Sequence, residues 1–262
     1  MKKVVTKANS DTFNLSISDL MAGLLAIFIL ILCYYILSFN AMKNEYEGST
    51  QLRKEMLLKL KERLKKEKIN VFIEEDKGVL HLPEKSVLFE SGSHETNAEG
   101  KEVIKKLGRA IYDTINEPDT NYRSKIGTIF IEGHTDDVRH SDDVRHWGST
   151  EKSTSKFDDF NWNLSTRRAI YTWEVMSKAT PELETFKNYE QEPLFSCSGY
   201  GPTRPIDLDY KESSNENEIK ESREKNRRID IRFTMLLPNE DSDKVLQKTI
   251  IHKAIEGKTK NE

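Results

Sequence analysis

The sequence predicts an α/β protein that is attached to a membrane by one N-terminal helix. Two patterns predict this class: an uninterrupted apolar run near the N-terminus, and a later stretch in which strand-like and helix-like segments alternate. The composition agrees, because only 36% of the 262 residues are hydrophobic and 32% are charged, as expected for a well-solvated domain. The net charge of −3 argues against a general nucleic-acid binder.

The apolar run covers residues 20–39 and reads LMAGLLAIFILILCYYILSF, without a charged side chain. A helix of this length rises about 30 Å, the thickness of the hydrocarbon core of a bilayer. A cleaved signal peptide has a shorter apolar core and a cleavage site of small residues, which the end at Tyr34, Tyr35 and Phe39 does not resemble. We therefore predict a single transmembrane helix over residues 13–40.

The basic residues around this run favour one orientation. Lys2, Lys3 and Lys7 precede it closely, whereas the basic residues that follow it lie somewhat farther away. The positive-inside rule then favours a cytoplasmic N-terminal tail over residues 1–12. The large domain that follows is expected on the opposite side of the inner membrane, in the periplasm.

Asp19 stands directly before the apolar run, in SISDLMAGLL. In one interpretation it caps the helix by accepting free backbone N–H groups. In the other, Phe13, Leu15 and Ile17 extend the apolar character upstream, so that Asp19 lies inside the span. Burial there favours the neutral carboxyl group, which suits a reversible ion carrier. One helix cannot connect both water compartments, so this second interpretation requires partner helices.

Residues 41–68 are predicted to form an amphipathic linker helix. Apolar residues recur at helical spacing, with lysines between them: Leu52, Met56, Leu57, Leu60 and Leu64. This face is expected to pair with its twin in a dimer, to cover a channel or to lie on the lipid surface. A solvated spacer helix is the other interpretation.

Residues 69–237 form the predicted globular domain. The strand-like runs are INVFIEE, GVLHLP, GTIFIEG, PLFSCSG and RRIDIRFTML, and the helix-like runs are AEGKEVIKKLGRAIYDTI, NLSTRRAIYTWEVMSKA and NEIKESREKN. Alternating elements of this kind predict an α/β sandwich, in which helices pack on one mixed sheet. Residues 238–262 are polar and are expected to be an exposed tail.

Four segments of this domain, in order, resemble the OmpA-like peptidoglycan-binding domain. They are SVLFESGS (86–93), IEGHTDD (131–137), NWNLSTRRA (161–169) and NRRIDI (226–231). The form is similar to that of the flagellar stator B subunits, the MotB-like proteins. The resemblance covers roughly two thirds of the chain and implies a periplasmic domain that holds the peptide stems of the cell wall.

The resemblance also implies which residues bind. A stem peptide with diaminopimelate offers an ammonium and a carboxylate on one side chain. Asp136 matches the family's ligand-binding aspartate, and Arg168 matches its binding arginine, which can hold a carboxylate by two parallel hydrogen bonds. Without the motifs, Asp136 would be a turn former and Arg168 a solvated helix residue. The other expected members shape the pocket or add positive charge: Thr135, Asn161, Leu164, Arg227 and Arg228.

The stretch between Asp137 and Asn161 is longer than the corresponding family loop. It contains a local repeat, DDVRH at 136–140 and again at 142–146, which supplies His140 and His146. Aspartate and histidine are metal ligands, but the spacing matches no metal motif. We interpret the 138–160 insertion as a solvated loop and predict no metal site.

The plan of the whole chain resembles that of stator B subunits, and SISDLMAGLL is more similar to the B-type (ZorB) subunits of the Zorya anti-phage motor. This implies a homodimer inside a ring of A-type (MotA/ZorA-like) membrane subunits, with Asp19 carrying H⁺ or Na⁺ and the C-terminal domains holding peptidoglycan. No nucleophile–base set suggests an enzyme, and no cofactor is expected. Two alternatives stay open: a flagellar stator B subunit, and a passive OmpA-like wall anchor without ion flow.

Overall fold

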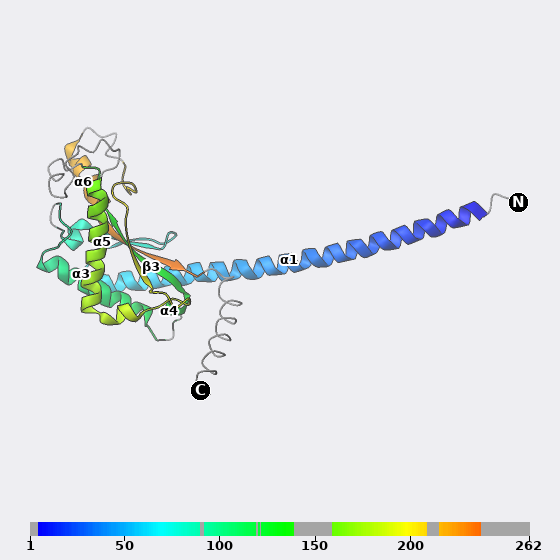
Figure 1. Cartoon of the computed structure of the whole chain (residues 1–262), viewed down its shortest axis with the longest axis horizontal. Helices are drawn as coiled ribbons and strands as arrows, with labels where there is room; N and C mark the ends of the chain where they lie inside the picture. Colours follow the sequence, from blue (N-terminus) through cyan, green and yellow to red (C-terminus); the bar gives the residue numbers. More distant parts are fainter. Residues whose placement is uncertain are drawn as a thin grey trace, which may run out of the picture. The chain divides into compact units, whose positions relative to one another are not determined.

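The computed structural model describes residues 5–89, 92–118, 120, 122–138, 159–208 and 215–236. The chain divides into two compact units, Met1–Gly48 and Ser49–Glu262. The elements, shown in Figure 1, are α1 (Val5–Lys66), β1 (Phe72–Glu74), β2 (Val79–Pro83), α2 (Glu84–Val87), α3 (Ala98–Ile115), α4 (Tyr122–Lys125), β3 (Ile126–His134), α5 (Asp159–Ala179), η2 (Pro181–Thr185), β4 (Phe195–Gly199), α6 (Glu216–Asn226) and β5 (Arg228–Met235).

The first unit is the N-terminal part of α1. Among the described residues, α1 alone is long and apolar enough to cross a membrane, judged by length and composition. Every large apolar side chain from Leu20 to Phe39 is exposed. A helix satisfies all its backbone hydrogen bonds within itself, which is the requirement for a segment in lipid.

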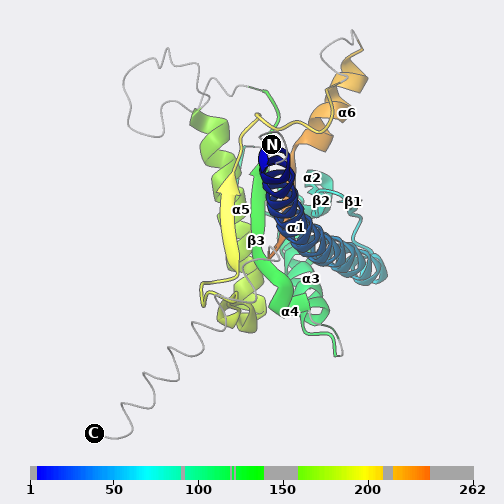
Figure 2. The ribbon, with the colours of Figure 1, turned by 90° about the vertical axis from the view of Figure 1, so that its right-hand side faces the viewer.

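The second unit contains a five-stranded sheet in the order β1-β2-β5-β3-β4. β3 and β4 are parallel, and the other neighbours are antiparallel. α5 packs along β3 and β4, and α3 packs against α5 (Figure 2). This arrangement confirms the predicted class, a mixed sheet with helices packed on it together with an apolar N-terminal helix.

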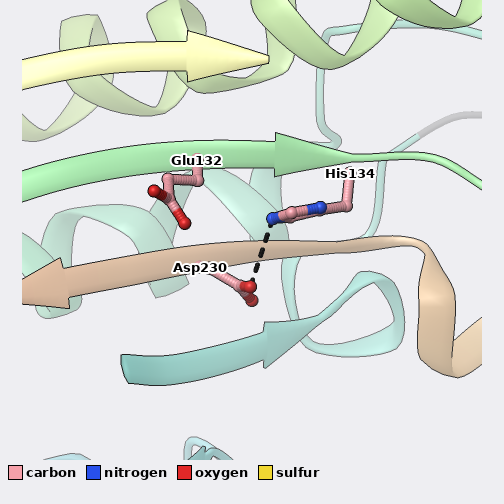
Figure 3. A group of neighbouring side chains, drawn as sticks. All are labelled: Glu132, His134 and Asp230. Atoms are coloured by element: carbon pink, nitrogen blue, oxygen red, sulfur yellow. Dashed lines mark ion pairs between the residues drawn. The ribbon is translucent and has the colours of Figure 1, made fainter. Parts of the chain in front are cut away.

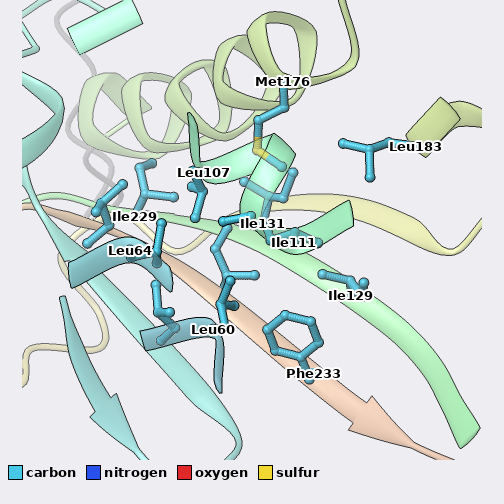
Figure 4. Close-up of a cluster of buried hydrophobic side chains, with 14 of the residues drawn as sticks. Leu60, Leu64, Leu107, Ile111, Ile129, Ile131, Met176, Leu183, Ile229 and Phe233 are labelled. Carbon is cyan, nitrogen blue, oxygen red and sulfur yellow. The ribbon is translucent and has the colours of Figure 1, made fainter. Parts of the chain in front are cut away.

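The strands β3 and β5 show why the two faces of the sheet differ. Their register places Ile131 opposite Ile231 and Glu132 opposite Asp230. Because successive side chains of a strand point to opposite faces, the isoleucines enter the hydrophobic core and the carboxylates lie on the other face. Figure 4 shows part of that core, which contains Ile129, Ile131, Ile229 and Phe233.

The C-terminal part of α1 belongs to the same core. Met56, Leu57, Leu60 and Leu64 are at most 1% exposed, and Leu60 and Leu64 lie among the sheet and helix side chains of the cluster (Figure 4). The apolar face predicted for the linker helix is therefore buried within the second unit, which begins at Ser49. It is neither a solvated spacer nor an open surface for a twin, a channel or lipid.

α1 ends in a motif that directs the chain into the sheet. Lys68 adopts a left-handed conformation with φ 61°. The amide of Ile69 donates to the Leu64 carbonyl over 2.9 Å, and the amide of Lys68 donates to the Lys65 carbonyl over 3.0 Å. This pair of bonds satisfies carbonyls that the helix end would leave free, and it brings the buried Ile69 back onto Leu64.

Candidate ligand-binding cleft

A cleft of about 310 Å³ gathers nearly all the side chains that the sequence motifs single out. Its lining consists of Glu84, Phe89, Gly92, Thr135, Asp136, Val138, Asn161, Leu164, Arg168 and Arg227. Of the predicted binding residues, only Arg228 is missing from this lining. The four motifs, far apart in the sequence, thus meet at one place.

The ends of the central elements explain this convergence. Thr135 and Asp136 directly follow β3, and Arg227 directly precedes the antiparallel β5. Asn161, Leu164 and Arg168 are spaced along the first turns of α5 so that they share one helix face. Gly133 permits the close approach of β3 to α5, because a Cβ atom there would lie 1.9 Å from the Ser165 carbonyl oxygen.

Four charged groups of alternating sign form a row along the cleft. Asp136 Oδ2 accepts from Arg227 Nη1 over 2.7 Å. Arg227 Nε donates in turn to Glu84 Oε2, and Glu84 Oε1 lies 3.0 Å from Arg168 Nη2. Two carboxylates and two guanidinium groups are thereby paired in sequence.

Further contacts fix the ends of this row. Arg168 Nε donates to the Ser93 carbonyl over 3.0 Å, and its guanidinium lies 4.7 Å from the centre of the Phe89 ring. Asp136 Oδ1 accepts from the Val138 amide over 3.2 Å. These contacts hold each charged group in one orientation, as a preorganised binding site requires.

Burial and ion pairing act in opposite directions on the two arginines. Burial lowers the pKa of Arg168, and the neighbouring Glu84 carboxylate partly offsets this. Burial also opposes the charge of Arg227, but its bonds to Glu84 and Asp136 outweigh burial and raise its pKa. An arginine side chain keeps its charge in a protein, so both groups suit recognition of an anionic group.

Glu84 is a member of the cleft that the sequence motifs did not indicate. It is the first residue of α2, and its amide donates to the Arg227 carbonyl over 3.0 Å. Its place follows from the pairing of β2 with β5, where Pro83 lies opposite Arg228. The strand register was the only signal that could have placed Glu84 beside Arg227.

Arg228 does not join the cleft, contrary to the expectation from the motif. Its Nε lies 3.0 Å and 3.1 Å from the two carboxylate oxygens of Asp230, and its Nη1 donates to the Asn226 carbonyl over 3.1 Å. Arg228 is the first residue of β5, so it shares a sheet face with Asp230, two positions along the strand. Its partners therefore belong to a second group of charged residues.

This second group, the cross-strand network, consists of His81, Glu132, His134, Arg228, Asp230 and Arg232. Figure 3 shows Glu132, His134 and Asp230 facing one another. Asp230 Oδ1 lies 2.7 Å from His81 Nδ1, and its Oδ2 lies 3.2 Å from His134 Nε2. Burial alone would raise the pKa of Asp230, but the surrounding His134, His81 and Arg228 outweigh it and lower the pKa.

Glu132, His134 and Asp230 also have the residue types of a metal site, with ligand atoms within 4.8 Å of one another. Both carboxylates are already engaged by arginine. Arg232 binds both oxygens of Glu132, over 2.9 Å and 2.7 Å, and Arg228 binds both oxygens of Asp230. A cation there would meet two guanidinium groups, so we interpret the network as a structural link between β3 and β5.

Asp19 belongs to the first unit. α1 begins at Val5, so Asp19 lies within the helix and not at its N-cap. The cap interpretation is therefore not supported, and the carboxyl group directly adjoins the apolar run. The second copy of the repeat and the two histidines of the long insertion fall within residues 139–158, outside the described part of the chain, as does the polar tail.

No protein-family model and no curated protein matches the chain. Among solved structures, it is similar to the periplasmic domain of Helicobacter pylori MotB (23% identity over 69% of this chain and 85% of that one, TM-score 0.37). It is also similar to a MotB-like protein from Desulfovibrio vulgaris (22%, 74% and 96%, TM-score 0.45). A third match is the cell wall anchor of the type VI secretion system from Pseudomonas aeruginosa (19%, 70% and 99%, TM-score 0.41). These values are too low to carry a functional argument.

Proposed function

We propose that this chain is the peptidoglycan-anchored, ion-translocating B subunit of a rotary motor in the inner membrane. The observation that carries the proposal is the cleft, where Asp136 and Arg168 lie with Thr135, Asn161, Leu164 and Arg227 around one cavity. The motifs that supply these residues are those that resemble the peptidoglycan-binding domain. In this proposal the cleft holds a stem peptide of the cell wall.

The chemistry of the cleft suits a side chain that carries both charges. Asp136 receives the ligand's ammonium, and Arg168 receives its carboxylate. Asp136 has an 8% exposed side chain and Arg168 a 3% exposed one, so little water competes for these bonds. Charged hydrogen bonds are stronger in such surroundings than in bulk water.

Pull-down on purified peptidoglycan tests this function with the full-length chain in detergent. We expect Asp136→Asn and Arg168→Ala each to lose most of the bound fraction, because each removes one half of the charge recognition. Asp113→Asn and Arg109→Ala are matched controls, since these residues pair with each other on the exposed face of α3. Equal retention of the cleft variants and the controls would contradict the proposal.

Within the membrane, Asp19 is the residue that we propose to carry the translocated ion. The residue lies within α1 beside the apolar run, where a carboxyl group is costly unless it is protonated, paired or in contact with water. Two copies of this chain, surrounded by a ring of A-type subunits, would provide the partner helices. The translocated ion is H⁺ or Na⁺.

Replacement of Asp19 separates a motor from a passive anchor. Asp19→Asn keeps the size of the side chain and removes its titration, whereas Asp19→Glu keeps the titration. We expect ion flux through the reconstituted complex to be abolished in the first variant and partly retained in the second. Full activity of the Asp19→Asn variant in the cell would favour the passive wall anchor, which needs no ion flow.

The assignment of a cellular role to the motor rests on the segment SISDLMAGLL alone. We propose anti-phage defence, with a flagellar stator as the alternative. Deletion of the gene in its native host distinguishes the two outputs. Increased sensitivity to phage with normal swimming supports defence, whereas loss of swimming with unchanged phage sensitivity supports the flagellar role.

A further inference from the structure

Glu84 joins the two arginines of the cleft through its two different carboxylate oxygens. Oε1 lies 3.0 Å from Arg168 Nη2, and Oε2 accepts from Arg227 Nε. The Glu84 side chain is only 15% exposed, so its carboxylate has little access to water. Glu84 thus already occupies donor groups that the carboxylate of a ligand would need.

Among the described residues that line the cleft, the charges balance before any ligand arrives. Glu84 and Asp136 contribute two negative charges, and Arg168 and Arg227 contribute two positive charges, linked in one row. An uncompensated charge is costly in a partly buried site. A ligand with a single charge therefore leaves one charged group of the cleft without an opposite charge. A ligand with both an ammonium and a carboxylate can replace the existing ion pairs with new ones of equal number.

We propose that Glu84 is the specificity-determining residue of the cleft. It selects a ligand side chain with both a free ammonium and a free carboxylate over one that has only the carboxylate. The ligand's carboxylate replaces Glu84 on Arg168, and its ammonium is received by the carboxylates of Glu84 and Asp136. This inference deepens the proposed wall-binding function and rests on it.

Removal of the Glu84 charge should weaken this preference. With Glu84→Gln the cleft has one excess positive charge, so a ligand with only a carboxylate restores the balance. With Arg227→Gln the cleft has one excess negative charge, so a ligand with only an ammonium restores it. The two variants should therefore move the selectivity in opposite directions.

Calorimetric titration of the full-length chain in detergent micelles tests this with three synthetic tripeptides. Their third residues are diaminopimelate, which carries both charges, 2-aminopimelate, which carries only the carboxylate, and lysine, which carries only the ammonium. We expect the wild-type chain to prefer the diaminopimelate peptide. Glu84→Gln should lower its preference over the 2-aminopimelate peptide by about tenfold or more, since mismatched buried charges are strongly disfavoured.

Glu184→Gln is the matched control, because it removes the same charge from an exposed position in η2, beyond the other end of α5. It should leave the affinity ratio unchanged. The inference is overturned if Glu84→Gln leaves the ratio of the affinities for the diaminopimelate and 2-aminopimelate peptides unchanged. An equal loss of affinity for both peptides is such a result, and it would mean that Glu84 only holds the arginines in place.

Thermal unfolding of each variant checks that it folds. Should Glu84→Gln not fold, Arg227→Gln carries the test, and an unchanged preference for the lysine peptide would overturn the inference. Failure of the wild-type chain to bind any of the three peptides overturns the proposed wall-binding function itself, and this inference with it. That result differs from normal wild-type binding with an unchanged ratio in the variants.

Discussion

Arg227 and Arg228 are neighbours in the sequence but belong to two different groups of charges. Arg227 lies in the cleft between Glu84 and Asp136, with a 27% exposed side chain. Arg228 lies in the cross-strand network on Asp230, with a 4% exposed side chain. Both groups pair largely buried carboxylates with guanidinium groups, and the first lines the cleft. In this protein, a group of ion pairs is a candidate binding site when it lines a cleft that a ligand can enter.

The largest expected effect concerns the stability of the cross-strand network. Arg228→Gln leaves Asp230 without its guanidinium partner in a position that is 1% exposed. Breaking a buried pair from one side costs about 3–5 kcal/mol. Chemical denaturation should show a loss of this size in the free energy of unfolding. A loss below about 1 kcal/mol, the range of surface ion pairs, would show that the network is not a structural link.

An intermediate effect is expected from pH, through His134. Burial lowers the pKa of His134 below its usual value, more strongly than Asp230 raises it. The unfolded chain therefore binds a proton that the folded chain does not, and stability falls as the pH drops through the unfolded pKa of about 6.5. Between pH 7 and pH 5 the slope should approach about 1.4 kcal/mol per pH unit.

Denaturation at several pH values measures this slope, with His134→Gln as the comparison. The variant should be less stable at pH 7 but should show a flatter dependence on pH. Asp230 does not contribute in this window, because its lowered pKa means that its stabilisation is lost only below the unfolded pKa of about 3.9. An identical slope in both chains would show that His134 does not titrate as the burial of its ring implies.

The smallest effect is expected for Arg227→Gln on stability. Its guanidinium is partly exposed, so loss of its pairs with Glu84 and Asp136 should cost about 1 kcal/mol or less after solvent screening is taken into account. The same variant should strongly change peptide selectivity. The free energies of unfolding of Arg227→Gln and Arg228→Gln should be measured in one denaturation series. A smaller loss for Arg227→Gln distinguishes a binding residue from a structural one, and equal losses would contradict this distinction.

The sequence predicted the fold class because its apolar patterns change period between strands and helices. Ile229, Ile231 and Phe233 alternate with charged residues, which indicates a strand with one apolar face. The packing partner of the apolar face in the C-terminal part of α1 could not be predicted in the same way. Helical spacing shows that Leu60 and Leu64 share a face, but not whether that face covers a partner, lipid or, as observed, the chain's own core.

The candidate site was predictable where motifs end at strand or helix termini, as at Asp136, Asn161 and Arg168. Two residues show the limits of this reasoning. Arg228 shares a motif with Arg227, but strand geometry turns its side chain towards Asp230. Glu84 lies in no charged motif, and only the β2–β5 register brings it to Arg227.

Calorimetric binding of a diaminopimelate stem peptide to the full-length chain, in the wild-type and Asp136→Asn forms, tests the central claim most directly. The proposed function predicts saturable binding to the wild-type chain and at least about a tenfold weaker affinity for the variant, because the ligand's ammonium loses its charged acceptor. Absence of binding to the wild-type chain, or equal affinity in both forms, would contradict the assignment of the cleft to the cell wall.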